Sequence, residues 1–310
     1  MTFGRFTGYL ERALSMKISI GFIGLGLMGT PMARRFLQSG YPVAVFNRTK
    51  DKVTQLLADG ATWFESPTLV AQHSNIVFTM LSNSESLEAI ALQSNGILNG
   101  LSGSGIHVDS STVSPETTSK LAKEYASKGS FFIHAPVLGS IPQATDGSLL
   151  LFVGGDERAF RKAEPALKCL GSKIWRFEKV EQATTTKLLC NFFIATMISG
   201  LCQALVMAKK AGVEPRVLLE IIGASALNAP MYQTKGASII ERNFKPRFFL
   251  EHMLKDVNLL IGAAKGLDVA MPSGEIAQAL FSEAVGLGLA REDYSAVVKV
   301  FEKIASVKVS

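Results

Sequence analysis

The stretch "KISIGFIGLGLMGTPMARRFLQSGYPVAVFNRT", residues 17–49, constrains the fold more than any other part of the chain. An apolar run ends at Ile23 and is followed by Gly24, Gly26 and Gly29 in the spacing G-x-G-x-x-G. An amphipathic helical pattern and a second β-branched run, Val43–Phe46, come next. This order of strand, glycine turn, helix and strand is typical of a dinucleotide-binding βαβ unit. The sequence therefore predicts an α/β fold with a parallel sheet.

Each glycine of this turn has its own expected task. Gly24 permits the tight turn, Gly26 lets the backbone approach a pyrophosphate, and Gly29 allows the helix to pack closely on the strand. The free N–H groups at the start of the helix then face the phosphates. The residues between the glycines are expected to line the same cofactor site: Leu25, Leu27 and Met28.

The residues that follow the second strand indicate which dinucleotide is bound. Enzymes that use NAD usually place Asp or Glu there to hold the ribose hydroxyls. This chain has Asn47, Arg48 and Thr49 instead. No carboxylate is present to repel a 2′-phosphate, and Arg48 can pair with one. We therefore expect NADP(H) as cofactor, with NAD(H) as the less favoured alternative.

The pattern of the chain changes near its middle, which predicts two domains. Strand and helix patterns alternate up to about Phe177, and only helical patterns follow. We expect an extension over residues 1–15, a doubly wound Rossmann-type NADP-binding domain over 16–180, and an all-α domain for substrate binding and dimerisation over 181–310. The candidate strands are Lys17–Ile23, Val43–Phe46, Asn75–Met80, Gly105–Val108, Phe131–His134, Leu149–Val153 and Lys173–Arg176. The candidate helices include Met28–Gln38, Lys50–Asp59, Pro115–Lys128, Glu181–Ala211, Glu214–Gly223, Pro230–Glu241, Leu250–Lys265, Ser273–Leu287 and Ser295–Ala305.

Composition narrows the class of protein. The chain is 47% hydrophobic, which suits a compact enzyme, and its net charge of +6 comes from scattered residues rather than a nucleic-acid-binding stripe. Three cysteines without a CxxC pair favour a reducing compartment and no structural zinc. The four histidines are too dispersed for a metal site. We expect a cytoplasmic protein, or an organellar one if residues 1–15 belong to a transit peptide.

The apolar run Leu188–Ala208 is long enough to span a bilayer. However, it contains Asn191 and Gln203 and lies in mid-chain between segments that read as soluble. A core helix that also packs against a second subunit is the better interpretation. We therefore expect no membrane contact and a homodimer or homotetramer.

Lys187 is unusual because this charged residue comes directly before the apolar run. Asn191 lies one turn further along the same face, and no Asp or Glu of the helix is within a turn. From the helix alone, a lysine reaching out to solvent is the favoured reading. The functional alternative is a proton donor, since apolar surroundings lower the pKa of a lysine.

Four sequence blocks, in this order, make the chain resemble the β-hydroxyacid dehydrogenases. This family includes 3-hydroxyisobutyrate dehydrogenase and the glyoxylate/succinic semialdehyde reductases. The blocks are "GFIGLGLMGTPMARRF", "VDSSTVSPETT", "APVLGSIPQATDGSLLLFVGGD", and "KLLCNFF" with "MLKDVNLL" further on. The resemblance implies that Lys187 is the catalytic acid/base and that Asn191 steers it or binds substrate, which reverses the reading from the helix alone.

The resemblance also implies roles for residues outside the lysine helix. Thr112 matches a position that touches nicotinamide and substrate, and Leu81 with Ser82 should border the cofactor. Gly139 and Ser140 match the loop that binds the substrate carboxylate. The remaining matches are Phe248 and Asp256 for the far wall of the substrate site and Lys255 for a position near the cofactor.

The chain departs from the family pattern A-P-V-S-G at one point, where Leu138 replaces the serine. Loss of that hydroxyl should weaken the binding of small acids such as glyoxylate. The sequence therefore predicts an NADP(H)-dependent oxidoreductase that interconverts a small aldehyde- or keto-acid and its hydroxy acid, with the acid as its small-molecule partner. An imine reductase and a non-catalytic NADPH sensor are the alternatives, although relatives of the imine type tend to lack the lysine.

Overall fold

The computed structural model describes residues 18–310, so the predicted extension over 1–15 lies outside the described residues. The chain divides into two compact units. The dinucleotide-binding unit comprises the residues up to Ser111 together with Glu116–Ala183. The helical unit comprises Thr112–Pro115 and Thr184–Ser310. The short segment that joins the helical unit from the first half of the chain includes Thr112, one of the predicted site residues.

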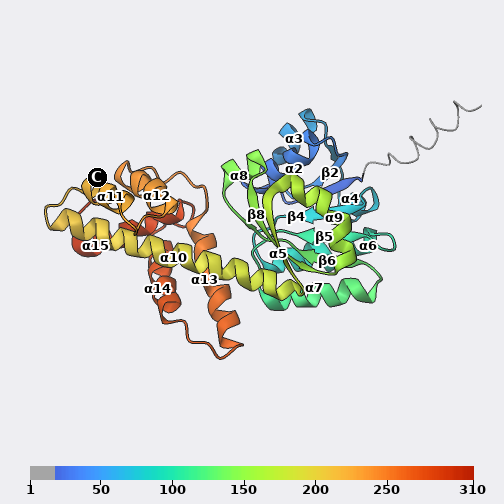
Figure 1. The fold of residues 1–310 in the computed structure, drawn as a ribbon. Coiled ribbons are helices and arrows are strands. Elements are labelled where there is room, and N and C mark those ends of the chain that lie inside the picture. Colours follow the sequence, from blue (N-terminus) through green and yellow to red (C-terminus); the bar gives the residue numbers. More distant parts are fainter. Residues whose placement is uncertain (1–17) are drawn as a thin grey trace, which may run out of the picture. The chain divides into compact units, whose positions relative to one another are not determined.

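A nine-stranded sheet forms the centre of the dinucleotide-binding unit, in the order β3-β2-β1-β4-β5-β6-β8-β7, with β9 on β8 (Figure 1). The pairings from β3 to β6 are all parallel, as the sequence predicts. The prediction missed an antiparallel edge, where β8 pairs with β6 and β7. It also missed β3 and β7, because two residues carry no readable period. The strands are β1 (Ile20–Ile23), β2 (Val43–Phe46), β3 (Thr62–Trp63), β4 (Ile76–Thr79), β5 (Ile106–Asp109), β6 (Phe131–His134), β7 (Val137–Leu138), β8 (Leu149–Gly155) and β9 (Gly171–Phe177).

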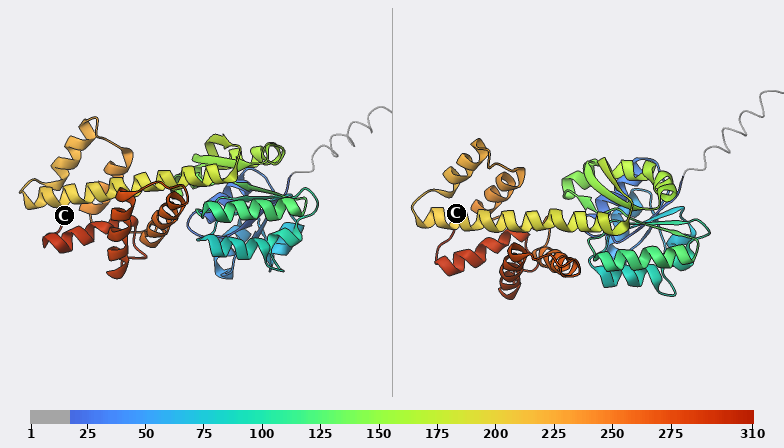
Figure 2. Two further views of the ribbon diagram at one scale, coloured as in Figure 1. Left: turned by 90° about the horizontal axis from the view of Figure 1, so that it is seen from below. Right: turned by 60° about the horizontal axis from the view of Figure 1, so that its bottom comes forward.

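Helices cover both faces of this sheet, which explains why β1, β4 and β5 are buried at every residue (Figure 2). One group packs around α2, and the other packs α4 and α5 against α6. The predicted helix Lys50–Asp59 is instead a 3₁₀ turn followed by a short helix, a common form at helix starts. The helices are α2 (Gly29–Gln38), η1 (Lys50–Val53), α3 (Thr54–Ala58), α4 (Pro67–Gln72), α5 (Ser84–Leu92), α6 (Ile97–Gly100), α7 (Pro115–Ser127), α8 (Ile141–Asp146) and α9 (Glu157–Leu170).

The parallel register aligns the strand ends that carry the predicted cofactor residues. Ile23 at the end of β1 is in register with Thr79 at the end of β4. Thr79 is in register with Asp109, and Asp109 with His134. The turns that follow β1, β4 and β5 therefore leave from one edge of the sheet, where ligands of doubly wound folds bind.

The helical unit is built on the long helix α10 (Val180–Lys210). Its inward residues, among them Ala195, Ile198 and Leu205, join a core with α13 and α14. Among the described residues, α10 is the one helix long and apolar enough to cross a membrane, but composition alone is weak evidence and its inward residues already belong to this core. The other helices are α11 (Pro215–Ala224), α12 (Pro230–Ile240), α13 (Leu250–Lys265), α14 (Pro272–Gly286), η2 (Tyr294–Val297) and α15 (Val298–Ala305).

A buried ion pair anchors the segment that leads into α13. Asp293 is 2% exposed and lies 2.7 Å from the Nζ atom of Lys235 on α12. Its carboxylate also accepts hydrogen bonds from the backbone N–H groups of Arg247 and Ser295. Because Arg247 lies just before α13, this carboxylate ties α12 and η2 to the start of the helix that carries Lys255 and Asp256.

We predict that Asp293→Asn lowers the free energy of unfolding by about 3–5 kcal/mol, because it leaves the Lys235 ammonium buried without its counter-charge. Urea unfolding followed by circular dichroism measures this change. The matched control is Glu283→Gln, which breaks an ion pair with Lys303 whose side chains are 54% and 60% exposed. That variant should change the free energy by less than about 1 kcal/mol. Equal unfolding midpoints for the two variants would contradict the prediction.

Candidate active site

The glycine turn after β1 combines close packing with open space. Gly24 has a φ of +97°, and a Cβ there would lie 2.3 Å from the carbonyl oxygen of Met80. A Cβ on Gly29 would lie 1.9 Å from the carbonyl oxygen of Gly24. A Cβ on Gly26 would meet nothing within 4 Å. The packing of the protein therefore requires glycine at positions 24 and 29, whereas Gly26 borders unfilled space.

The start of α2 is suited to an anion. Met28 occupies the N-cap position, and no side chain caps the first N–H groups of the helix. Leu25 is buried in the core, whereas Leu27 is 41% exposed beside the turn. Uncapped N–H groups and the helix dipole both favour a phosphate at such a position.

Asn47 braces the glycine turn from the end of β2. Its Oδ1 atom accepts a hydrogen bond from the Leu25 N–H at 2.9 Å, and its Nδ2 atom donates to the Thr49 carbonyl oxygen at 2.8 Å. Arg48 and Thr49 are exposed beside it. Within residues 18–310, the Arg48 guanidinium forms no hydrogen bond or ion pair. The three residues thus divide into one that holds the turn and two that face solvent.

The turns after β4 and β7 carry the other predicted residues of this unit. The Leu81 N–H donates to Ser111 Oγ at 2.8 Å, and Ser82 is exposed next to it.

The loop after β7 holds the residues predicted for the substrate. Leu138 is half-buried on β7, and Gly139 has a φ of +144°. The Ser140 N–H is already bonded to Gln143 Oε1 at 2.9 Å, where Ser140 is the N-cap of α8. The family resemblance predicts that this loop binds the substrate carboxylate, and it does not indicate that the Ser140 N–H is bonded within the loop.

The helical unit gathers a second group of predicted residues around Lys187. This lysine is 9% exposed, and Asn191 on the same face of α10 is 3% exposed. The Asn191 Nδ2 donates to Asp256 Oδ2 on α13 at 2.6 Å. The other oxygen of Asp256 lies 2.7 Å from Lys255 Nζ as an ion pair, without the alignment of a hydrogen bond. Lys255 also donates to the carbonyl oxygen of Thr112.

Burial lowers the pKa of the Lys187 ammonium below its usual range. Asp256 opposes this shift through its negative charge, and Lys255 adds to it through its positive charge. The result is a lysine that is easier to deprotonate than an exposed one, close to one carboxylate. A lysine with a lowered pKa exchanges its proton more readily than an exposed one, which suits a general acid or base.

The structure adds partners that sequence reasoning missed. The sequence has no acid within one turn of Lys187 on its own helix, and Asp256 supplies that charge from a helix more than sixty residues further on. Phe248, predicted on the substrate wall, packs its ring against Tyr294 and His252. His252 lies one turn before Lys255 and Asp256, and burial followed by the charge of Lys255 lowers its pKa.

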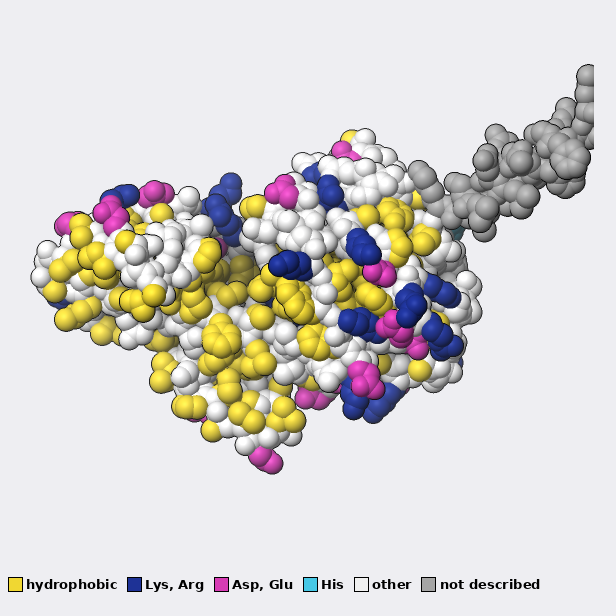
Figure 3. Space-filling view, viewed as in Figure 1, with side chains coloured by type: hydrophobic (Ala, Val, Ile, Leu, Met, Phe, Trp, Pro, Cys, Tyr) yellow, Lys and Arg dark blue, Asp and Glu magenta, His cyan; other side chains and the backbone are white. Residues whose placement is uncertain are grey.

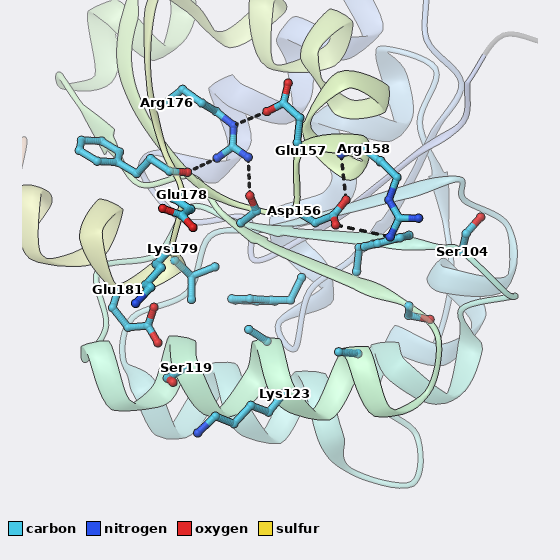
Figure 4. A pocket seen from close by; sticks show the side chains of 18 of the residues that line it. Ser104, Ser119, Lys123, Asp156, Glu157, Arg158, Arg176, Glu178, Lys179 and Glu181 are labelled. Atoms are coloured by element: carbon cyan, nitrogen blue, oxygen red, sulfur yellow. Dashed lines mark hydrogen bonds and ion pairs between the residues drawn. The ribbon is translucent and has the colours of Figure 1, made fainter.

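A pocket of about 1300 Å³ opens elsewhere on the dinucleotide-binding unit (Figure 4). It lies between α7 and the ends of β8 and β9, and no predicted site residue lines it. Its two arginines are paired with acids, with Arg176 3.5 Å from Glu157 and Arg158 3.6 Å from Asp156. No residue of the glycine turn lines this pocket, so it is separate from the predicted cofactor site.

Comparison with known proteins decides the family. Residues 19–180 match "NAD binding domain of 6-phosphogluconate dehydrogenase", and residues 182–301 match "NAD-binding of NADP-dependent 3-hydroxyisobutyrate dehydrogenase". The chain is 35% identical to glyoxylate/succinic semialdehyde reductase 2 of Arabidopsis thaliana over 93% of this chain and 81% of that protein. It is also 35% identical to 2-(hydroxymethyl)glutarate dehydrogenase of Eubacterium barkeri, over 96% and 99%. The chain belongs to the β-hydroxyacid dehydrogenase family.

A solved structure supports the same conclusion. The 3-hydroxyisobutyrate dehydrogenase of Mycobacterium tuberculosis superposes with a TM-score of 0.84 at 26% identity, over 92% of this chain and 99% of that one. This β-hydroxyacid dehydrogenase is therefore an NAD(P)-dependent oxidoreductase that acts on a CH–OH group. The open space at Gly26 and the uncapped start of α2 fit a pyridine nucleotide.

The glycines provide a matched pair of variants. We predict that Gly26→Ala leaves the free energy of unfolding within about 0.5 kcal/mol of the parent, because its Cβ enters open space. The same variant should weaken NADPH binding about tenfold or more, since the methyl group occupies the expected pyrophosphate position. Gly29→Ala should destabilise the fold by about 1–3 kcal/mol, because it forces α2 away from the turn.

Thermal unfolding and fluorescence titration with NADPH measure the two effects. An unchanged dissociation constant for Gly26→Ala would show that no phosphate passes over this residue.

Proposed function

We propose that this β-hydroxyacid dehydrogenase is an NADP(H)-dependent enzyme that interconverts a small aldehyde- or keto-acid and its hydroxy acid. The buried Lys187 beside Asn191 and Asp256 carries the proposal, because it supplies a proton donor of lowered pKa. A protein that only sensed the nucleotide would need no such group. Three free cysteines are compatible with a reducing compartment such as the cytoplasm.

The preference for NADP(H) rests on Arg48. Its exposed guanidinium has no partner in the described part of the chain, and it follows β2, where the adenosine ribose of a dinucleotide is held. A guanidinium pairs with a phosphate through two parallel hydrogen bonds. No Asp or Glu stands among residues 47–49 to repel that phosphate.

The reaction needs a hydride, which the nicotinamide supplies when the cofactor is bound. The chain must supply the proton. In the direction of reduction, the Lys187 ammonium donates a proton to the carbonyl oxygen as negative charge develops on it, and the lysine becomes a neutral amine. Asp256 holds the amide of Asn191 in one orientation, so that the Asn191 oxygen is presented to the lysine or to the substrate.

The substrate class follows from the relatives and from Leu138. Relatives are named for glyoxylate, succinic semialdehyde and 2-(hydroxymethyl)glutarate, all of which carry a carboxylate. Leu138 places an apolar side chain where the family pattern has a serine. We therefore propose an acid with a longer or less polar chain than glyoxylate as the preferred substrate.

We predict that Lys187→Ala lowers kcat for carbonyl reduction by about 10²–10⁴-fold, because the proton donor is removed. Lys187→Arg should also be slow, since arginine keeps its charge and does not release a proton. With wild type, the rate of reduction should fall as pH rises through the lowered pKa of Lys187, because only the ammonium form donates. NADPH oxidation with glyoxylate, succinic semialdehyde and methylmalonate semialdehyde is the measurement.

The control for this series is Lys210→Ala, at the exposed end of the same helix. It should match wild type at every pH. A Lys187→Ala variant with full activity would remove the lysine from the mechanism. Reduction of a cyclic imine but of none of the three acids would favour an imine reductase instead.

We also propose that the protein is a homodimer or homotetramer. Apolar side chains gather on the surface of the helical unit (Figure 3). On α10, Phe193 and Met207 are 61% and 68% exposed, and Leu189 lies one turn before Phe193 on the same face. No charged residue lies between Lys187 and Lys209. An uncharged exposed face of this length favours association with a second subunit over contact with water.

Phe193→Glu should convert the oligomer to a smaller species, because it places a charge on that face. Size-exclusion chromatography with light scattering at micromolar concentration gives the mass. The control is Ile304→Glu on α15, an exposed apolar residue outside α10. A wild-type protein that is monomeric would contradict the proposal directly.

A further inference from the structure

A buried carboxylate at the end of β5 organises the edge of the sheet that carries the predicted cofactor residues. Asp109 is 0% exposed. Its Oδ1 atom accepts hydrogen bonds from the hydroxyl groups of Thr79 and Ser111, each at 2.6 Å. Its Oδ2 atom accepts from the Ser111 N–H at 3.2 Å and lies 3.4 Å from His134 Nε2. Because the side chain is fully buried, the carboxylate acts on neighbouring protein groups.

The donors and acceptors around Asp109 allow only one direction for each hydrogen bond. A carboxylate only accepts, so the single hydroxyl proton of Thr79 points to Asp109. Thr79 Oγ1 must then accept the proton of His107 Nε2, which lies 2.8 Å away. His107 Nδ1 consequently has no proton and accepts from the Tyr125 hydroxyl at 2.8 Å. The chain of bonds therefore runs from Tyr125 on α7 to Asp109.

The protonation of these groups agrees with that direction. Burial lowers the pKa of His107 to about 4, so at neutral pH its ring is uncharged and carries one proton. Burial opposes ionisation of Asp109, but hydrogen bonding and charge from His134 outweigh it and hold the pKa of the carboxyl below its usual value. Asp109 is thus ionised in the folded protein and remains a pure acceptor.

The hydrogen bonds of Asp109 continue through Ser111 to the turn after β4. Ser111 gives its only hydroxyl proton to Asp109, which leaves the lone pairs of its Oγ free to accept the Leu81 N–H at 2.8 Å. Leu81 and Met80 in turn lie against Gly24, since a Cβ on that glycine would meet atoms of both. The turn after β4 is therefore held by Ser111 on one side and supports the glycine turn on the other.

We infer that Asp109 and Ser111 are positioning residues, which fix the Leu81 amide and through it the glycine turn that binds the dinucleotide. This inference rests on the proposed function, because it assigns the two residues an effect on cofactor affinity. Neither residue needs to touch the cofactor. If Leu81 is displaced, the atoms that pack against Gly24 move with it. The backbone N–H groups of the glycine turn then lose their alignment with the phosphates.

Two adjacent serines provide the test. Ser111→Ala removes the acceptor of the Leu81 N–H, whereas Ser110→Ala removes a buried hydroxyl that has no hydrogen-bond partner within residues 18–310. We expect Ser111→Ala to raise the dissociation constant for NADPH roughly 3- to 10-fold, the effect of one lost hydrogen bond. Its kcat at saturating NADPH should stay within about twofold of wild type, because the proton donor is untouched. Ser110→Ala should leave both quantities unchanged.

Asp109→Asn is the second variant, for the case that Ser111→Ala does not fold. The amide offers only one accepting oxygen, so it satisfies either the two hydroxyl groups or the Ser111 N–H. Its dissociation constant for NADPH should rise at least as far as that of Ser111→Ala. Unchanged affinity in a folded Ser111→Ala or Asp109→Asn protein would overturn the inference. A loss of kcat in proportion to the loss of folded protein, with unchanged affinity, would assign these residues to stability alone.

The outcome for wild type separates this inference from the proposed function. If wild type binds neither NADPH nor NADH, the proposed function fails before the variants are compared. If wild type binds a nucleotide and Ser111→Ala binds it equally well, only the positioning role is lost.

Discussion

The burial of one ammonium group places the strongest physical demand on the helical unit. Lys187 stands among apolar side chains of α10, where removal from water disfavours its charge. Asp256 on α13 offsets part of that penalty, and Asp256 is itself buried and needs its own donors. Asn191 donates a hydrogen bond to one oxygen of Asp256, and the Lys255 ammonium lies beside the other as a counter-charge. The packing of α13 against α10 is therefore required by charge as well as by apolar contact, and the ion pair of Asp293 with Lys235 fixes where α13 begins.

Much of the fold could be predicted because its signals are local. The bounds of Val43–Phe46, Phe131–His134 and Leu250–Lys265 agree with β2, β6 and α13 to the residue. The two strands that were missed contain two residues each, which is too short for any period to show. The antiparallel edge was missed for another reason. The direction of β8 depends on the connection at residues 135–148, which contains β7 and α8, and the apolar pattern of β8 does not indicate the path of that connection.

The sequence proposes the candidate site as a set of residues but not as a set of contacts. The glycine spacing indicates the turn, and the family resemblance assigns Lys187, Asn191 and Asp256 to one site as a prediction. It did not indicate that Asn191 would donate to Asp256, because 65 residues separate them. The histidines gave no signal as a spaced motif, yet strand register places His134 on one side of Asp109 and Thr79, which bonds to both Asp109 and His107, on the other. Contacts made by register across a sheet have no signature along the chain.

Arg48 differs from its neighbours because it holds nothing in place. Asn47 braces the glycine turn and cannot be exchanged without disturbing it, whereas the Arg48 side chain contributes no bond to the described fold. Under the proposed role of Arg48, recognition of the nucleotide and integrity of the scaffold fall to adjacent residues. It follows from that proposal that a lineage carrying this arrangement can change its nucleotide preference through one exposed position while the sheet and the glycine turn remain intact, which makes cofactor choice an evolvable trait rather than a fixed property of the architecture.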